Sequence, residues 1–155
     1  MISLKTIWPN TPSPYAHIEV TGLTADSRQV QQGFVFVALQ GRQYDARRFM
    51  TQAIEQGAVA VLCQSDKPST EQQGIPIINI VDLPQQLGEI AARFYKQPSQ
   101  DLTLCAITGT NGKTSCAQLL AHACQFLGQK SAVLGTLGNG LVGELVPSTH
   151  TTLDA

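Results

Sequence analysis

The chain has 155 residues, of which 43% are hydrophobic and 14% charged, and its formal net charge is −1. This composition excludes a disordered chain, and the near-zero net charge excludes binding to nucleic acid or to an anionic membrane by charge alone. The sequence shows no bilayer-spanning apolar stretch and no secretory signal layout, so we expect a cytoplasmic protein. Nothing in the sequence specifies an oligomeric state, and a monomer is the default expectation.

The first predicted elements form a strand, a helix and a second strand. Three prolines within residues 9–14 argue for an irregular lead rather than a helix. The β-rich apolar run 34–39 predicts a buried strand. Asp45 has the character of a helix cap, so we expect a helix that ends at Gly57 and a buried strand over residues 58–62.

A third strand is predicted after the polar segment 64–74. It covers residues 75–81, where Pro76 indicates the edge of a sheet or the beginning of a strand. The helix that follows has Pro84 in its first turn and is expected to end before Pro98.

We expect the domain boundary here, with one domain over residues 1–98 and a second over 99–155. The second contains a predicted strand at 102–108, a helix at 113–127 and a strand at 131–136. A strand-helix-strand unit is the kind that builds parallel sheets. Two strands and one helix, however, cannot bury both faces of a parallel sheet. We therefore expect the second domain to be incomplete.

The cysteines show no metal-binding pattern. They lie in apolar stretches without a CxxC pair, which favours reduced, buried thiols over a metal site. The four are Cys63, Cys105, Cys116 and Cys124.

The sharpest motif is TGTNGKT, from Thr108 to Thr114, between a predicted strand and a predicted helix. Glycines let backbone N–H groups curl around phosphate oxygens, and the helix N-terminus adds partial positive charge. Lys113 can reach the β- and γ-phosphates, and the Thr114 hydroxyl can ligate Mg²⁺. The alternative, a Gly-Lys-Thr triplet that only begins a helix, is disfavoured by the flanking elements. The expected ATP-binding residues are Gly109, Thr110, Asn111, Gly112, Lys113, Thr114 and Ser115.

The form GTNGKT, with Ile107 where the common phosphate loop has its first glycine, resembles the Mur ligase and folylpolyglutamate synthetase superfamily. Nearly the whole chain except the proline-rich start shares the resemblance. The similar segments are residues 24–28, 33–38, 41–45, 52–58, 135–140 and 151–155.

The resemblance implies an α/β fold, with a small UDP-binding domain followed by the truncated start of a P-loop parallel-sheet ATPase domain. On composition alone, residues 26–28 are equally well a capped turn and residues 148–152 a polar loop. The residues that the resemblance places on the UDP-muramoyl peptide are Ala25, Ser27, Arg42, Gln43, Tyr44, His150, Thr151 and Thr152.

The implied activity is that of an ATP- and Mg²⁺-dependent ligase of peptidoglycan precursor synthesis, with Lys113 and Thr114 as its catalytic residues. The substrates would be UDP-N-acetylmuramoyl-L-alanyl-D-glutamate and a diamino acid, meso-diaminopimelate being favoured over lysine. A fragment of this length is expected to be inactive alone. Three alternatives stay open: a D-alanyl-D-alanine-adding ligase, a folylpolyglutamate synthetase-like ligase, and a non-catalytic nucleotide-sugar-binding module.

Overall fold

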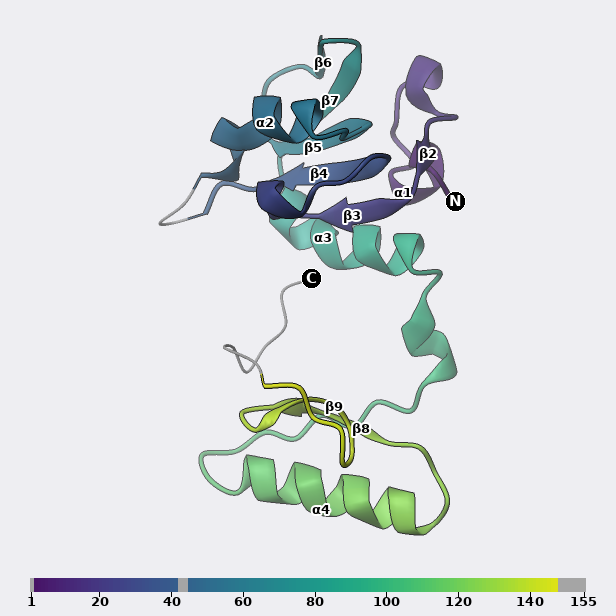
Figure 1. Cartoon of the computed structure of the whole chain (residues 1–155), viewed down its shortest axis with the longest axis vertical. Coiled ribbons are helices and arrows are strands. Elements are labelled where there is room, and N and C mark those ends of the chain that lie inside the picture. The colour runs from purple at the N-terminus through teal and green to yellow at the C-terminus, as the bar shows by residue number, and fades with distance from the viewer. Residues whose placement is uncertain (1, 42–44, 148–155) are drawn as a thin grey trace. The chain divides into compact units, whose positions relative to one another are not determined.

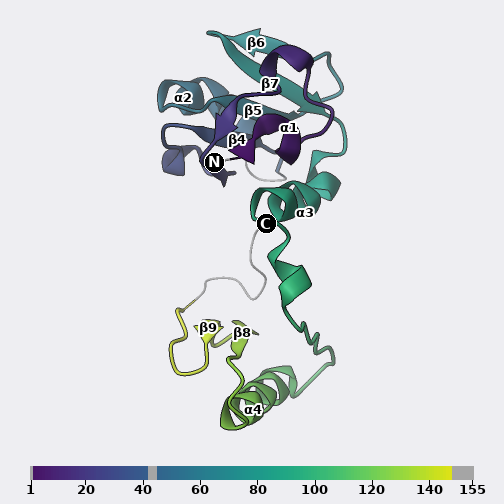
Figure 2. The same cartoon turned by 90° about the vertical axis from the view of Figure 1, so that its right-hand side faces the viewer.

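The computed structural model describes residues 2–41 and 45–147, and the chain divides into two compact units, Met1–Gln100 and Asp101–Ala155 (Figure 1, Figure 2). Each unit has its own core and is described by itself. No helix within the described residues has the length and apolar character needed to cross a membrane.

The first unit is built on a five-stranded sheet in the order β3-β4-β5-β7-β6. The first four strands in this order pair in parallel, and β6 pairs antiparallel to β7. The bounds are β3 (Gly22–Thr24), β4 (Phe34–Ala38), β5 (Ala60–Gln64), β6 (Thr70–Gln72) and β7 (Ile75–Ile80).

Helices bury both faces of this sheet, which explains why its strands are continuous apolar runs. Successive residues of a strand point to opposite faces. Val35 and Val37 therefore pack in one cluster with α1 and α3, whereas Phe36 and Ala38 pack in a second cluster with α2. The helices are α1 (Leu4–Ile7), α2 (Met50–Glu55) and α3 (Leu83–Phe94).

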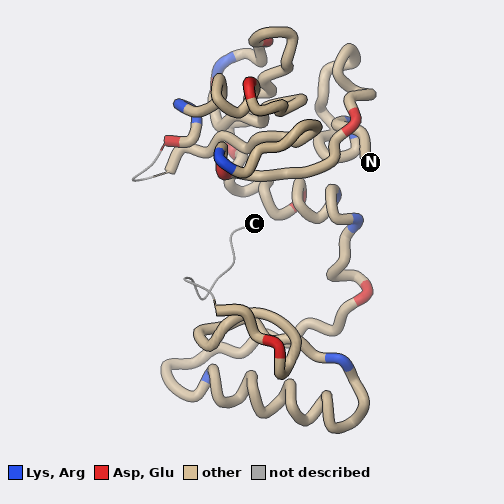
Figure 3. The backbone as a smooth tube through the Cα atoms, in the orientation of Figure 1, with Lys and Arg blue, Asp and Glu red and all other residues tan. Residues whose placement is uncertain are grey.

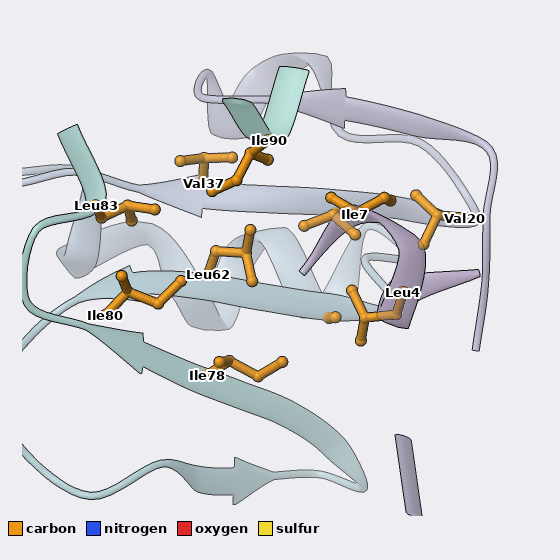
Figure 4. Close-up of a cluster of buried hydrophobic side chains, with 11 residues drawn as sticks. Leu4, Ile7, Val20, Val37, Leu62, Ile78, Ile80, Leu83 and Ile90 are labelled. Carbon is orange, nitrogen blue, oxygen red and sulfur yellow. The ribbon is translucent and has the colours of Figure 1, made fainter. Parts of the chain in front are cut away.

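The proline-rich lead contributes directly to this core, which corrects the expectation of a wholly irregular start. Leu4 and Ile7 of the one-turn helix α1 are 0% exposed, and they lie beside Val20 at one end of the cluster (Figure 4). The Ser3 hydroxyl caps α1 by accepting from the Thr6 N–H. Strand β1 (Ile2–Ser3) pairs antiparallel with β2 (Glu19–Val20) and holds α1 in place.

Pro76 lies at the beginning of a strand, as the sequence predicted. Pro76 is the second residue of β7, and it precedes Ile77, where pairing with β5 begins, so its missing N–H removes no bond from that ladder. Strand β7 lies inside the sheet, so of the two positions predicted for Pro76 the beginning of a strand is the one found. The edge strand is β6, which lies within the polar segment 64–74 and was not predicted.

The helix predicted after Asp45 forms in two parts, a 3₁₀ turn over Ala46–Phe49 and then α2. Asp45 is a helix cap as predicted, because its carboxylate accepts from the Arg47 N–H at 3.1 Å. Gly57, with φ of +105°, follows the helix as predicted.

The second unit contains one long helix and one hairpin. The helix α4 (Lys113–Phe126) packs through Ala121 on Val133 and Val142. The hairpin consists of β8 (Ala132–Gly135) and β9 (Gly138–Leu141), which pair antiparallel.

The predicted parallel pairing in this unit is wrong for the described residues. Residues 102–108 form no strand, and Leu102 and Leu104 are 62% and 72% exposed. A strand requires a hydrogen-bonding neighbour, and β8 pairs with β9 instead. The α/β class stands because the parallel strands of the first unit are covered by helices on both faces.

The prediction of buried cysteines holds only for Cys63. Cys124 is half-buried, and Cys105 and Cys116 are exposed, although all four are free. Cys105 lies in the unpaired segment, which explains its exposure.

Candidate functional site

The TGTNGKT segment forms an exposed loop that leads into α4. Gly112 is the residue before the helix and has φ of +80° and ψ of −4°, the left-handed conformation that favours glycine. A Cβ built at Gly112 would meet no atom within 4 Å, and one at Gly109 would meet only the Asn111 carbonyl oxygen, at 3.6 Å. The space around the loop is therefore open.

The backbone N–H groups at the start of α4 are available to a ligand. The first intrahelical bond at this end runs from Cys116 N–H to the Gly112 carbonyl at 2.9 Å. The N–H groups of Lys113, Thr114 and Ser115 precede it and have no acceptor within the helix. Together with the helix dipole, these donors suit an anion such as a phosphate group.

Lys113 carries the only charge on α4, at the end where the helix dipole disfavours a cation (Figure 3). Its Nζ donates to the carbonyl oxygens of Gly109 at 2.6 Å and Thr110 at 3.3 Å. An ammonium has three N–H donors, so these two bonds leave one for a ligand. A phosphate bound here would offset the unfavourable placement of the charge.

Thr114 makes a contact that was not expected from the sequence. Its Oγ1 lies 3.0 Å from Oγ1 of Thr136, which stands in the turn between β8 and β9. Residues 135–140 were identified only as similar to the ligase family, and no residue pattern in this segment predicts that it lies close to Thr114. The contact depends on how the hairpin packs on α4.

The donor set fits a nucleoside triphosphate with its metal. Backbone N–H groups and an ammonium suit phosphate oxygens, and a threonine hydroxyl suits Mg²⁺. Among the described residues no cluster of three His, Cys, Asp or Glu could hold a metal ion. The Thr114 hydroxyl, which the sequence motif predicts as a Mg²⁺ ligand, is the candidate protein ligand here, and phosphate oxygens and water would supply the others.

Two of the predicted substrate residues of the first unit, Ala25 and Ser27, lie after the carboxyl end of β3. Ala25 is exposed there, whereas Ser27 is buried and its hydroxyl donates to Oε1 of Gln52 at 3.4 Å. Asp26 caps the turn by accepting from the Arg28 N–H and pairs with the Arg28 guanidinium at 2.6 Å. That pairing holds the pKa of Asp26 at about 2, so the carboxylate stays ionised. The segment therefore forms a capped turn, and the contact of Ala25 and Ser27 with a substrate stays a prediction.

The neighbouring strand β4 also ends at this edge of the sheet, which is where open α/β sheets bind ligands. An antiparallel bridge between Gln40 and Asp45 closes the loop that follows β4. The predicted residues Arg42, Gln43 and Tyr44 in this loop, and His150, Thr151 and Thr152 in the second unit, lie outside the described residues.

Arg47 supports the base of this loop and was not among the predicted site residues. Its guanidinium pairs with Asp45 at 2.8 Å and donates to the Gln64 carbonyl at 3.3 Å. Hydrogen bonding to Arg47 lowers the pKa of Asp45, and the same bond raises the pKa of Arg47. These contacts connect the carboxyl ends of β4 and β5.

Two family models match the chain. The model described as "Mur ligase family, catalytic domain" matches residues 19–95, and the "Mur ligase middle domain" matches residues 107–155. The second match includes the whole of the GTNGKT loop.

Solved structures of ligases are similar as well. The chain is 34% identical to a UDP-N-acetylmuramoyl-L-alanyl-D-glutamate–2,6-diaminopimelate ligase, over 99% of this chain and 31% of that one, with a TM-score of 0.76. It is 27% identical to a UDP-N-acetylmuramoylalanyl-D-glutamyl-2,6-diaminopimelate–D-alanyl-D-alanyl ligase from Acinetobacter baumannii, over 70% and 23% of the two chains, with a TM-score of 0.54. Each match covers less than a third of the length of the solved protein.

Proposed function

Because the chain belongs to the Mur ligase family, we propose that it carries the UDP-binding unit and the phosphate loop of an ATP-dependent amide-forming ligase. The proposed substrates are UDP-N-acetylmuramoyl-L-alanyl-D-glutamate and a diamino acid, which is meso-diaminopimelate rather than lysine. This is a step in the synthesis of peptidoglycan precursors. We expect it to take place in the cytoplasm, where ATP and UDP-linked precursors are available.

The choice of substrate within the family rests on one observation. The similarity to the diaminopimelate-adding ligase extends over 99% of this chain, whereas that to the D-alanyl-D-alanine-adding ligase extends over 70% and is weaker. This difference favours the former reaction.

The proposed chemistry proceeds in two steps. The D-glutamyl carboxylate attacks the γ-phosphorus of ATP, so that a bond to the carboxylate oxygen forms, the bond to the bridging oxygen breaks and ADP leaves. The free amine of the diamino acid then attacks the acyl phosphate carbon, the carbon–oxygen bond to phosphate breaks, the nitrogen loses one proton and inorganic phosphate leaves. Catalysis of this kind depends on positioning and on stabilising charge that moves between oxygens.

The residues of the loop have separate roles in this proposal. The N–H groups at the start of α4 would hold phosphate oxygens, and Lys113 would stabilise the charge of the transferring phosphoryl group. The Thr114 hydroxyl would ligate Mg²⁺, which offsets phosphate charge when bound.

The substrate end is assigned to the first unit. The UDP group would bind at the carboxyl ends of β3 and β4, near Ala25 and the turn at Ser27. The remaining proposed contacts to the UDP-muramoyl peptide are Arg42, Gln43, Tyr44, His150, Thr151 and Thr152.

One experiment separates this proposal from its rivals. On a protein of full ligase length that contains this chain, phosphate release from ATP should require both UDP-N-acetylmuramoyl-L-alanyl-D-glutamate and meso-diaminopimelate. Release that depends instead on D-alanyl-D-alanine or on a folate substrate would assign another ligase. Calorimetric binding of the UDP-sugar with no affinity for ATP would assign a non-catalytic binding module.

A further inference from the structure

The contact between Thr114 and Thr136 has a specific geometry. The two hydroxyl oxygens lie 3.0 Å apart, and either can donate the hydrogen. Thr114 lies in the first turn of α4, and Thr136 lies between the two strands of the hairpin. The two residues are 22 positions apart, so the tertiary fold alone brings them together.

The position of Thr136 is held by the hairpin. Gly135 pairs with Gly138 across the turn, and the Gly135 N–H donates to Oδ1 of Asn139 at 3.1 Å. Val133 of β8 is buried against Ala121 of α4. The hydrogen bonds of the turn and the packing of β8 on α4 therefore hold the Thr136 hydroxyl beside Thr114.

A hydroxyl that ligates a cation offers an oxygen lone pair to the metal, so its own hydrogen must point to another acceptor. The Thr136 oxygen is such an acceptor at hydrogen-bonding distance from Thr114. We infer that Thr136 is a positioning residue, which accepts the hydrogen of the Thr114 hydroxyl and turns that oxygen toward the nucleotide-bound Mg²⁺. This inference rests on the proposed function.

A merely structural role for Thr136 leads to a different expectation. If the contact only fastened the hairpin to α4, its loss would weaken nucleotide binding to the same extent with and without metal. If Thr136 orients a metal ligand, its loss acts on the metal-dependent part of binding, because the phosphate contacts of the loop stay in place.

The test compares calorimetric affinities for ATP in the presence of Mg²⁺ and in the presence of EDTA, measured on a protein of full ligase length that contains this chain. Thr136→Val keeps the shape and removes the acceptor, Thr136→Ser keeps the acceptor, and Thr103→Val makes the same change at an exposed threonine of the same unit. We expect Thr136→Val to reduce the gain in affinity due to Mg²⁺ about tenfold, and the other two variants to stay within about twofold of the original chain.

Each result decides the question. An unchanged Mg²⁺ effect in Thr136→Val, equal weakening with and without Mg²⁺, or a loss in Thr136→Ser as large as in Thr136→Val would overturn the positioning role. Thermal unfolding of each variant identifies any that fail to fold, and Thr136→Ala, which also removes the acceptor, replaces Thr136→Val if that variant does not fold. Absence of ATP binding by the unsubstituted protein of full ligase length would instead contradict the proposed function, which makes the two failures distinguishable.

Discussion

The ammonium group of Lys113 lies 2.6 Å from the carbonyl oxygen of Gly109, so the side chain folds back over the loop that precedes its own helix. This arrangement places a cation next to backbone N–H groups that have no intrahelical acceptor. The proposed nucleotide site therefore has its donors gathered within a few residues of one helix end.

The first prediction concerns Lys113→Ala. Because the side chain is exposed and its ammonium donates to carbonyl oxygens of its own loop, the substitution should leave thermal unfolding unchanged. It removes a charged donor, so the affinity for ATP should fall by about tenfold or more in calorimetry. Lys130→Ala, which removes an exposed charge from the same unit, is the matched control. An equal loss of ATP affinity in both variants would mean that the net charge of the chain, and not the position of Lys113, determines the affinity.

Gly112→Ala tests the left-handed residue before α4. Apart from its chain neighbours, no atom of the described chain lies within 4 Å of the added Cβ, so the effect on folding comes from the backbone conformation. An alanine in this region costs about 1 kcal/mol, and Gly112→Asn should cost less because asparagine tolerates it better. ATP affinity is expected to fall in the order glycine, asparagine, alanine. Equal affinity in all three would show that the loop does not need this conformation.

Asp26→Asn should reveal a pH-dependent contribution to the stability of the first unit. The pKa of Asp26 is lowered from 3.8 to about 2, mainly by hydrogen bonds from Arg28. A carboxylate with a lowered pKa stabilises the folded state above its unfolded pKa, and the contribution disappears as the pH falls through the folded pKa.

The difference in urea unfolding free energy between the original chain and Asp26→Asn should therefore be largest above about pH 4 and shrink toward about pH 2. Asparagine retains an oxygen that can accept from the Arg28 N–H, so the capping bond is preserved. A difference that does not change with pH would exclude the ion pair as its source.

A pair of valines tests the core of the parallel sheet. Val61 of β5 is 0% exposed, whereas Val81, just after β7, is 63% exposed. Val61→Ala should cost about 2 to 3 kcal/mol of unfolding free energy through lost burial and a residual cavity. Val81→Ala should cost less than about 0.5 kcal/mol in the same urea titration. Similar costs would contradict the burial assigned to β5.

Thiol labelling separates the cysteines. Cys105 and Cys116 are exposed and should react quickly with iodoacetamide at neutral pH. Cys63 is buried, and burial raises the pKa of its thiol, so it should react only on unfolding. Mass spectrometry of the labelled peptides measures the rates. Rapid labelling of Cys63 in the folded chain would show that the sheet opens at this position.

The sequence alone identified the features that depend on neighbouring residues. The apolar run around Val35 and the cap at Asp45 were predicted because strand period and capping chemistry are local. The GTNGKT spacing likewise indicated an exposed loop before a helix, and α4 begins at Lys113 as that spacing requires.

Only the tertiary structure determined the strand pairing, the core packing and the side-chain contacts that join residues far apart in the sequence. Residues 102–108 have the composition of a strand but form none, because pairing requires a neighbour that composition does not specify. Leu4 is in the core despite the prolines that follow it, because α1 packs against α3. The contact between Thr136 and Thr114 could not be predicted from the sequence either. The two residues are 22 positions apart, and their hydroxyl groups meet only after the hairpin packs on α4.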